Sequence, residues 1–412
     1  MSSDKTDLYI LAGAAQDATR PPIRPAAIHW SDGGIIAIGS PDELPPPAGA
    51  RVIERPSHLV LPPFVNAHAH LDLTSIGPQP YGGDFIEWID FVRSARPSDP
   101  DALAASVRLG IEKSIAGGTA IIGDIGGLGS TVPLEVLRAD GRLRGINFVE
   151  FFGLGTRQRQ AVEAMERVCA EFPIDPDSRV QVGLQPHAPY SAGPEVYAAA
   201  ARLSAARGLP ASTHLAETID EIEFVQDAAG PFADYLRRIE KWDAEIQATR
   251  AHPIDLFHRT LAGSATWLVA HVNYCNEAHL EALASRAATV VYCPRATEYF
   301  GHGPHDYREM IECGVQMALG TDSIINLDRS DRISMLDEMS LLHRRDRVQP
   351  AILLRLATIE GAWALHVDER LVTLQPGPCA GLIAVEFDLR DATDPLRQVL
   401  RSPGPIEWLA RA

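Results

Sequence analysis

The 412-residue sequence lacks any long apolar run. No segment of about 18 consecutive apolar residues occurs, so we expect no membrane-spanning helix. Residues 1–7 are polar, and the apolar run that follows them is too short for the core of a signal peptide. These absences predict a cytoplasmic protein.

Cysteine is scarce, and basic residues form no cluster. The five cysteines are odd in number, widely spaced and without a CxxC pair, which argues against a disulfide framework or a cysteine-ligated zinc site. The formal net charge is −17. We therefore expect no nucleic acid and no anionic membrane surface as partner, and solubility is the simplest explanation of the acidity.

What the chain does contain is a regular alternation of strand-like and helix-like stretches. Segments with helical periodicity, such as 101–116, 160–171 and 194–207, separate short apolar runs. The first run lies near residue 60, and the others are residues 119–124, 145–150, 180–184, 211–214, 267–271, 289–293 and 316–322. Eight such units are the count of a (β/α)8 TIM barrel. An open doubly wound sheet is the competing arrangement, but no GxGxxG fingerprint follows these runs.

Both ends of the chain carry further short runs that indicate strands. These runs are residues 7–11, 26–30, 35–38 and 381–387, with a hairpin turn at 31–34. Neither end can bury much apolar surface alone. We therefore predict an α/β fold in which residues 61–368 form the barrel, while residues 1–60 and 369–412 together form a small β-sandwich domain.

A histidine pair, His68 and His70, directly follows the first apolar run of the barrel. Alternate residues of a strand point to the same face, so both imidazoles can reach one ion, and imidazole is a common metal ligand. The motif alone is weak, because the 14 histidines of this chain would form roughly half an HxH pair by chance.

Four more polar residues stand where later strands are predicted to end. His187 follows the fourth strand, His214 the fifth, His271 the sixth and Asp322 the eighth. In a barrel these ends meet at the active-site face. Any one of the histidines could be an ordinary hydrogen-bonded core residue, but scattered core histidines would not all fall at one end.

Glu217 lies three residues after His214. A carboxylate at this spacing can reach the same site and move a proton from water to a leaving group as a general acid/base. The alternative is a carboxylate in the first turn of a helix, interacting with the helix dipole. Asp322 can complete a metal shell and hydrogen-bond the bound water.

The order of these motifs resembles the amidohydrolase superfamily. His-x-His, His-x-x-Glu, a single His and Gly-Thr-Asp-Ser follow one another as in its cytosine, adenosine and guanine-type deaminases and triazine hydrolases. Residues 186–190, Pro-His-Ala-Pro-Tyr, are similar to a strand-four signature of that branch. The resemblance covers nearly the whole chain, and it implies that one divalent metal is held by His68, His70, His214 and Asp322.

The same resemblance implies roles for the other residues. Glu217 would transfer the proton, His271 would orient or polarise the water, and His187 would face the substrate. The metal would lower the pKa of water from 15.7 toward about 7. Hydroxide would then attack a ring carbon, with Asp322 or His271 helping to remove the proton of the attacking water, and ammonia would leave.

The scarcity of lysine bears on the number of metal ions. Binuclear members of the superfamily bridge two ions with a carboxylated lysine, usually after strand four. The only lysines here are Lys5, Lys113 and Lys241, and none ends a predicted strand. We therefore expect one ion. Zn²⁺ is the first expectation from a His3Asp shell, and Fe²⁺ would accept the same ligands.

The loop after the HxH motif suggests the substrate. Its Tyr-Gly…Phe-x-x-Trp pattern over residues 81–88 resembles the aminodeoxyfutalosine deaminases of menaquinone biosynthesis, which implies an aminated purine or purine-like nucleoside. Glu87 would accept hydrogen bonds from the ribose hydroxyls, and Trp88 or Phe85 would stack on the base. The alternative is that these aromatic residues form the packed face of a helix.

Arg295 lies in a second loop, where the sequence departs from the Cys-Pro-x-Ser-Asn pattern of the branch. It would bind a substrate carboxylate, or else form an ion pair with Glu298 or Asp306. Two other functions stay open: a chlorohydrolase or cyclic amidase of the same superfamily, and a non-catalytic metal-binding barrel. A purely structural site needs no general base, which disfavours the last. The resemblance also implies a homodimer.

Overall fold

The computed structural model describes residues 7–261, 267–284, 288–391 and 394–412. The chain divides into two compact units. One comprises residues 1–66, 112–121 and 331–412, and the other comprises residues 67–111 and 122–330. The predicted boundaries at residues 60 and 369 stay a prediction.

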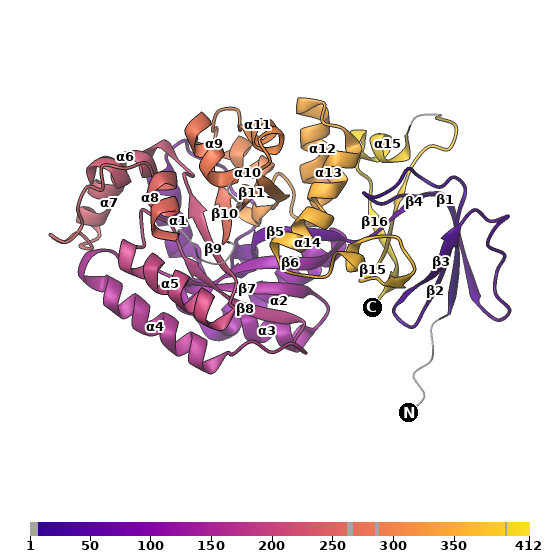
Figure 1. Cartoon of the computed structure of the whole chain (residues 1–412), viewed down its shortest axis with the longest axis horizontal. Coiled ribbons are helices and arrows are strands. Elements are labelled where there is room, and N and C mark those ends of the chain that lie inside the picture. Colours follow the sequence, from indigo (N-terminus) through magenta and orange to yellow (C-terminus); the bar gives the residue numbers. More distant parts are fainter. Residues whose placement is uncertain (1–6, 262–266, 285–287, 392–393) are drawn as a thin grey trace. The chain divides into compact units, whose positions relative to one another are not determined.

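Parallel strands form the larger of two sheets, and its strands β5 to β11 are labelled in Figure 1. In spatial order, with β12 and β13 at the two edges, the strands are β12 (Gln316–Leu319), β11 (Ala288–Tyr292), β10 (Trp267–His271), β9 (Ala211–Leu215), β8 (Val180–Pro186), β7 (Arg144–Phe151), β6 (Thr119–Gly126), β5 (Phe64–His70) and β13 (Asp322–Ser323). β9, β10 and β11 are buried along their whole length. Burial on both faces explains why their sequences are nearly continuous apolar runs.

The two edge strands of this sheet are consecutive in the chain. Only Gly320 and Thr321 separate β12, which pairs with β11, from β13, which pairs with β5. The Gly320 N–H donates to Tyr292 O at 2.9 Å and the Thr321 N–H to His68 O at 3.0 Å. One short segment thus joins both edges and closes the sheet, which confirms the predicted (β/α)8 barrel.

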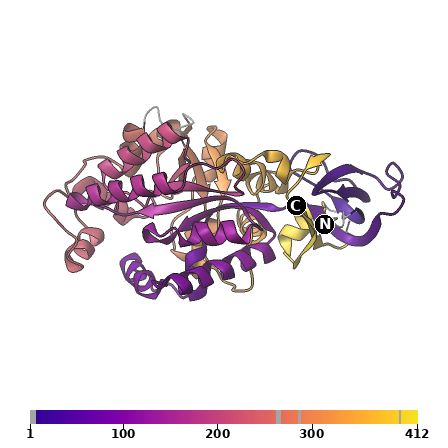
Figure 2. The ribbon, with the colours of Figure 1, turned by 90° about the horizontal axis from the view of Figure 1, so that it is seen from below.

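Helices follow the strands along the chain. In the barrel region they are α1 (Phe85–Ala95), α2 (Pro100–Ala116), α3 (Val132–Asp140), α4 (Gln158–Glu171), α5 (Pro194–Arg207), α6 (Ile219–Asp227), α7 (Pro231–Arg238), α8 (Pro253–Leu261), α9 (Glu277–Ala284), α10 (Pro294–Tyr299) and α11 (Tyr307–Glu312). The three predicted helices are confirmed as α2, α4 and α5. Figures 1 and 2 show α4 and α5 side by side along the outside of the strands, where they contact β7 and β8.

The C-terminal part of the chain adds four more helices. They are α12 (Met335–Asp346), α13 (Pro350–Leu356), α14 (Ile359–Ala364) and α15 (Pro395–Arg401). None of the helices in the described ranges is long and apolar enough to cross a membrane. The cytoplasmic location stays a prediction.

Both termini contribute to the second sheet, as predicted. In spatial order its strands are β14 (Gly377–Pro378), β3 (Gly34–Gly39), β2 (Ala26–Ser31), β1 (Leu8–Ala15), β4 (Arg51–Leu61), β15 (Gly381–Glu386) and β16 (Ile406–Arg411). β15 pairs with β4 in antiparallel register, and β1 pairs with β4 in parallel. Asp32 and Gly33 both have positive φ, at 51° and 77°, as the predicted hairpin turn between β2 and β3 requires.

Gly145 offers a test of the packing in the barrel. Its φ is +131°, and a Cβ atom built on it would lie 2.0 Å from the carbonyl oxygen of Ile122. We expect Gly145→Ala to lower the free energy of unfolding by about 1–3 kcal/mol, because backbone must move to admit the methyl group. Thermal denaturation measures this loss. Gly82→Ala, at a position with nothing within 4 Å, is the control, and an equally stable Gly145→Ala variant would contradict the close approach.

Candidate metal centre

Three histidines and one aspartate converge at the C-terminal ends of β5 and β9 and at the start of β13, just after β12. His70 Nε2 lies 3.4 Å from His214 Nε2 and 3.4 Å from Asp322 Oδ1. His68 Nε2 lies 3.7 Å from the same carboxylate oxygen. All four side chains are buried. Their arrangement brings together residues that are more than 250 positions apart in the sequence.

The protonation of these side chains suits metal binding. His214 Nδ1 lies 2.9 Å from the carbonyl oxygen of His187; a carbonyl only accepts, so Nδ1 carries the proton and Nε2 presents a lone pair toward His70. Burial lowers the pKa of His214 to about 3 and holds that of His70 well below its usual range. The free Nε2 lone pair of His214 is therefore available to a cation. The donors fit Zn²⁺ or a similar ion, and they form a histidine-rich metal site.

Asp322 supplies the negative charge of this site. Burial alone would raise its pKa, but the surrounding histidines, His68 foremost, hold the pKa well below its usual value. Asn326 Nδ2 donates to Asp322 Oδ2 at 2.6 Å. The carboxylate is therefore ionised and fixed in orientation, as a metal ligand requires.

His271 lies between the metal ligands and Glu217. Its ring is stacked on that of His214, with centroids 5.4 Å apart, and its Nε2 lies 3.6 Å from Glu217 Oε1. His68, His271 and Asp322 also form a second group whose ligand atoms lie within 4.8 Å of one another. The geometry thus gives His271 access both to an ion and to the acid/base candidate.

Glu217 is a buried carboxyl held by hydrogen bonds. The Tyr190 hydroxyl donates to its Oε2 at 3.2 Å, and Asn273 Nδ2 donates to its main-chain carbonyl at 3.0 Å. Burial, and then the negative charges of Asp322 and Glu221, raise the pKa of Glu217 well above its usual value. A carboxyl of this kind stays protonated near neutral pH and can donate a proton.

The helix that follows Glu217 begins at Ile219, so the alternative of a first-turn carboxylate applies to other residues. The acidic residues of its first turn are Asp220 and Glu221. The Glu221 carboxylate accepts the N–H groups of Ala216 and Glu217, both at 2.8 Å, and Thr218 caps the helix. The Thr-x-x-Glu spacing of a capping box was the signal that could have identified Glu221.

Strained main chain surrounds the site. His271, Val272 and Asp322 have φ values of 73°, 53° and 58°, and Ala216 has 47°. Each left-handed non-glycine residue costs about 1–3 kcal/mol and persists only where the surroundings enforce it. Such residues cluster at functional sites, and here they turn the chain where β9, β10 and β12 end.

A cavity of about 420 Å³ opens onto the metal site. Its inner end includes His70, His214, Glu217 and Asp322. Aromatic residues of its wall are Trp88, Phe152, Tyr190, Phe232 and Tyr235, and basic residues of its lining are Arg93, Arg96, Arg157 and Lys241. The volume suits a small heterocyclic molecule.

His187 lines this cavity. Its ring is stacked on Phe152 with centroids 4.4 Å apart, and its Nδ1 lies 2.7 Å from Ser191 Oγ. Its Nε2 lies 3.7 Å from Glu150 Oε1, and burial holds its pKa well below the usual value. A neutral, oriented imidazole therefore faces the cavity, while its role toward substrate stays a prediction.

Glu87 and Arg295 lie elsewhere. Glu87 is exposed on α1 and is not one of the described residues that line the cavity. Its neighbour Trp88 does line the cavity, while Phe85 packs in an aromatic cluster with Trp88 stacked on it. Arg295 is buried on α10, pairs with Asp328 at 3.4 Å, and likewise is not among the described lining residues. The rotation of each helix, which a short sequence does not reveal, decides these placements.

Sequence reasoning missed a buried charge network beside the site. Arg96 Nε lies 3.0 Å from Asp72 Oδ2, and Arg96 Nη1 lies 3.3 Å from Glu150 Oε2. Burial raises the pKa of Asp72 to about 6. These residues come from separate elements, and nothing local in the sequence connects them.

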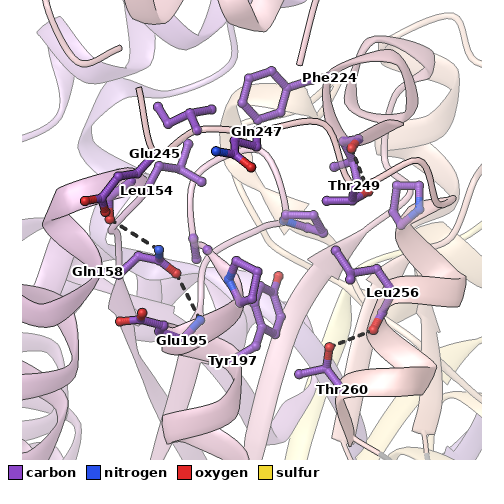
Figure 3. A pocket seen from close by; sticks show the side chains of 18 of the residues that line it. Leu154, Gln158, Glu195, Tyr197, Phe224, Glu245, Gln247, Thr249, Leu256 and Thr260 are labelled. Carbon is purple, nitrogen blue, oxygen red and sulfur yellow. Dashed lines mark hydrogen bonds between the residues drawn. The ribbon is translucent and has the colours of Figure 1, made fainter. Parts of the chain in front are cut away.

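A second cavity, of about 360 Å³, lies near the start of α5 and shares Leu154 with the first. Figure 3 shows its side chains. Gln158 accepts the Glu195 N–H and donates to Gly155 O, and the Thr260 hydroxyl donates to Leu256 O. No histidine is among the described residues that line it, and both groups of convergent ligands lie outside it.

Comparison with known proteins places these features in context. The model of the amidohydrolase family matches residues 59–404. The chain is 24% identical to a 5-methylthioadenosine/S-adenosylhomocysteine deaminase of Pelotomaculum thermopropionicum, over 88% of this chain and 81% of the relative. It is 26% identical to the deaminase of the same name from Syntrophobacter fumaroxidans, over 94% of this chain and 86% of that relative.

Solved structures share the fold. The aminofutalosine deaminase of Helicobacter pylori aligns with a TM-score of 0.78 at 20% identity, covering 97% of both chains. Atrazine chlorohydrolase from Arthrobacter aurescens, complexed with zinc, aligns with a TM-score of 0.76 at 18% identity, covering 96% of this chain and 91% of the other. An adenosine deaminase from Xanthomonas campestris, also with bound zinc, aligns with a TM-score of 0.71 at 21% identity, covering 95% of this chain and 90% of the other.

The metal site predicts a specific loss of affinity. We expect His214→Asn to weaken zinc binding by at least about 100-fold, because even partners outside the ligand shell contribute 10- to 100-fold. Competition with a chromophoric chelator measures the change. His258→Asn, on α8 and outside both groups of convergent ligands, is the control. Unchanged zinc affinity in the His214 variant would contradict the site.

Proposed function

The chain belongs to the amidohydrolase family, and we propose that it is a metal-dependent deaminase of an aminated purine or purine-like nucleoside. The observation that carries this proposal is the buried Glu217 beside a histidine-rich metal site, at the inner end of a cavity with aromatic walls. Relatives named as 5-methylthioadenosine/S-adenosylhomocysteine deaminases, at 24–26% identity, support the substrate class.

One divalent ion, Zn²⁺ or Fe²⁺, is held by His68, His70, His214 and Asp322 in this proposal. Such an ion acts as a Lewis acid and lowers the pKa of a coordinated water. Neither described lysine ends a barrel strand, the position of the lysine that bridges two ions, since Lys113 lies on α2 and Lys241 follows α7. His271 orients the attacking water.

Glu217 moves the protons. The water oxygen bonds to the ring carbon, the exocyclic C–N bond breaks, and the nitrogen leaves as ammonia, so that one water is consumed. Glu217 begins protonated and gives this proton to the ring nitrogen. It then takes one proton from the attacking water, passes it to the departing amine, and recovers the second proton of the water as the carbonyl forms. Tyr190 occupies its Oε2, which leaves Oε1, the oxygen near His271, for this transfer.

Glu217→Gln tests the proposed reaction. The variant keeps the shape of the side chain but cannot carry the proton, so we expect kcat to fall by about 100- to 10,000-fold with zinc still bound. Ammonia release is measured over adenosine, 5-methylthioadenosine, S-adenosylhomocysteine, guanine and aminodeoxyfutalosine. Glu223→Gln, at an exposed position of α6, is the matched control.

The outcomes of that assay separate the competing functions. No ammonia from any substrate, with metal bound to the wild-type protein, would overturn the proposal. Chloride or a carboxylate product from halogenated or cyclic-amide substrates would favour a chlorohydrolase or a cyclic amidase. Turnover that survives in the Glu217 variant would overturn the role of that residue.

The basic residues of the cavity favour a substrate with an acidic group. Lys241 is an exposed residue of the cavity lining. Arg157 donates a hydrogen bond to the main-chain carbonyl of Lys241 and forms an ion pair with Asp243 at 3.5 Å. In a chain with a net charge of −17, such side chains select for a negative group. We therefore favour nucleosides that carry a carboxylate, and we assign its binding to Arg157 and Lys241 in place of Arg295.

Lys241→Met separates charged from neutral substrates. We expect the KM for S-adenosylhomocysteine to rise about 2- to 5-fold, the value of one exposed charge pair, while the KM for 5-methylthioadenosine stays unchanged. Steady-state kinetics at low ionic strength measures both. Arg159→Gln, with an exposed side chain on α4, is the control, and an equal change for both substrates would contradict the assignment.

A further inference from the structure

We propose that His305, between α10 and α11, is a positioning residue for His271 and acts through one hydrogen bond to its main chain. The inference rests on the proposed function in one respect, namely that His271 takes part in the reaction. It concerns a residue that is neither among the described residues that line the cavity nor itself one of the convergent ligands.

The hydrogen bond joins the His305 ring to the main-chain carbonyl of His271. His305 Nε2 lies 2.7 Å from His271 O, and because the carbonyl only accepts, Nε2 is the donor. The ring is buried and stacked on Tyr292, with centroids 4.0 Å apart and an interplanar angle of 25°. Tyr292, in β11, is itself fully buried. The donor is therefore held in place by the barrel wall.

The bond acts on a peptide group that is strained on both sides. His271 and Val272 have φ values of 73° and 53°, and the peptide group between them carries the carbonyl of the first and the N–H of the second. The Val272 N–H donates to Leu215 O at 2.9 Å. With His305 on the carbonyl, both polar ends of this one peptide group are fixed. Its orientation determines where the His271 imidazole points.

The segment after β11, which contains both α10 and His305, also supports Glu217. The Thr297 hydroxyl donates to Asn273 Oδ1 at 3.0 Å, and Asn273 Nδ2 donates to Glu217 O at 3.0 Å. Two chains of contacts thus run from the segment after β11 to the two residues that flank the reacting atoms. Hydrogen bonds therefore link this segment to the main chain of both His271 and Glu217.

The competing explanation is that His305 only fills space against Tyr292, and two variants separate the two roles. His305→Gln keeps an N–H donor of similar reach but loses the ring. His305→Phe keeps the stacked ring but loses the donor. A positioning role predicts that Phe lowers kcat per bound zinc by about 10- to 100-fold, with little change in KM, and that Gln restores it. A packing role predicts the opposite order.

Zinc release gives a readout that does not depend on turnover. Because the ligand atom of His271 lies within 4.8 Å of those of the proposed ligands His68 and Asp322, a displaced His271 disturbs the site. We therefore expect the Phe variant to release zinc to a chelator about tenfold faster than wild type, and the Gln variant to match wild type. Melting temperatures are measured alongside, and the packing role predicts that Gln melts lower than Phe. His302→Phe, in the same loop and bonded to Tyr274, is the matched control.

The inference stands if the Phe variant is impaired and the Gln variant is not, in kcat per bound zinc or in zinc release. Any other order of the two variants overturns it. Absence of ammonia release by the wild-type protein would overturn the proposed function instead, and zinc release would then decide the role of His305.

Discussion

Closure of the barrel by its eighth strand is the constraint on which the site depends. The strand pairs first with β11 and then with β5, and the change of partner occurs at Gly320, where a Cβ atom would lie 2.8 Å from His68. Closure sets Asp322 opposite Ala69 and Ser323 opposite His70. The carboxylate thereby meets the two imidazoles of the first strand, and the metal site exists only in the closed sheet.

Burial and the neighbouring side chains then set the protonation state of each ionisable group in the site. It keeps the imidazoles of His70 and His214 neutral, as metal ligands must be, and it keeps Glu217 protonated. Asp322, equally buried, has a pKa well below its usual value beside His68, and its carboxylate accepts a hydrogen bond from Asn326. Two carboxyl groups in one cavity thus differ in protonation, and in the proposed function this difference suits one as ligand and the other as proton carrier.

The segments that follow the strands have two different roles. Those after β5 and β7 bring Trp88, Phe152 and Arg157 to the cavity, where these side chains can contact a substrate. The segment after β11 contacts the main chain of His271 through His305. A loop at the active-site face of a barrel therefore need not touch the substrate, and strained strand ends require such support.

The sequence by itself determined the barrel, the composite β domain and the polar residues at the strand ends, because hydrophobic alternation and the position of a residue after a strand are local properties. It did not determine which side chains face the cavity. Glu87 is exposed and Arg295 is paired with Asp328, whereas Lys241, far from every motif, lines the cavity. Only the tertiary structure decided these placements, because they depend on how each helix is rotated and on contacts between residues distant in the chain.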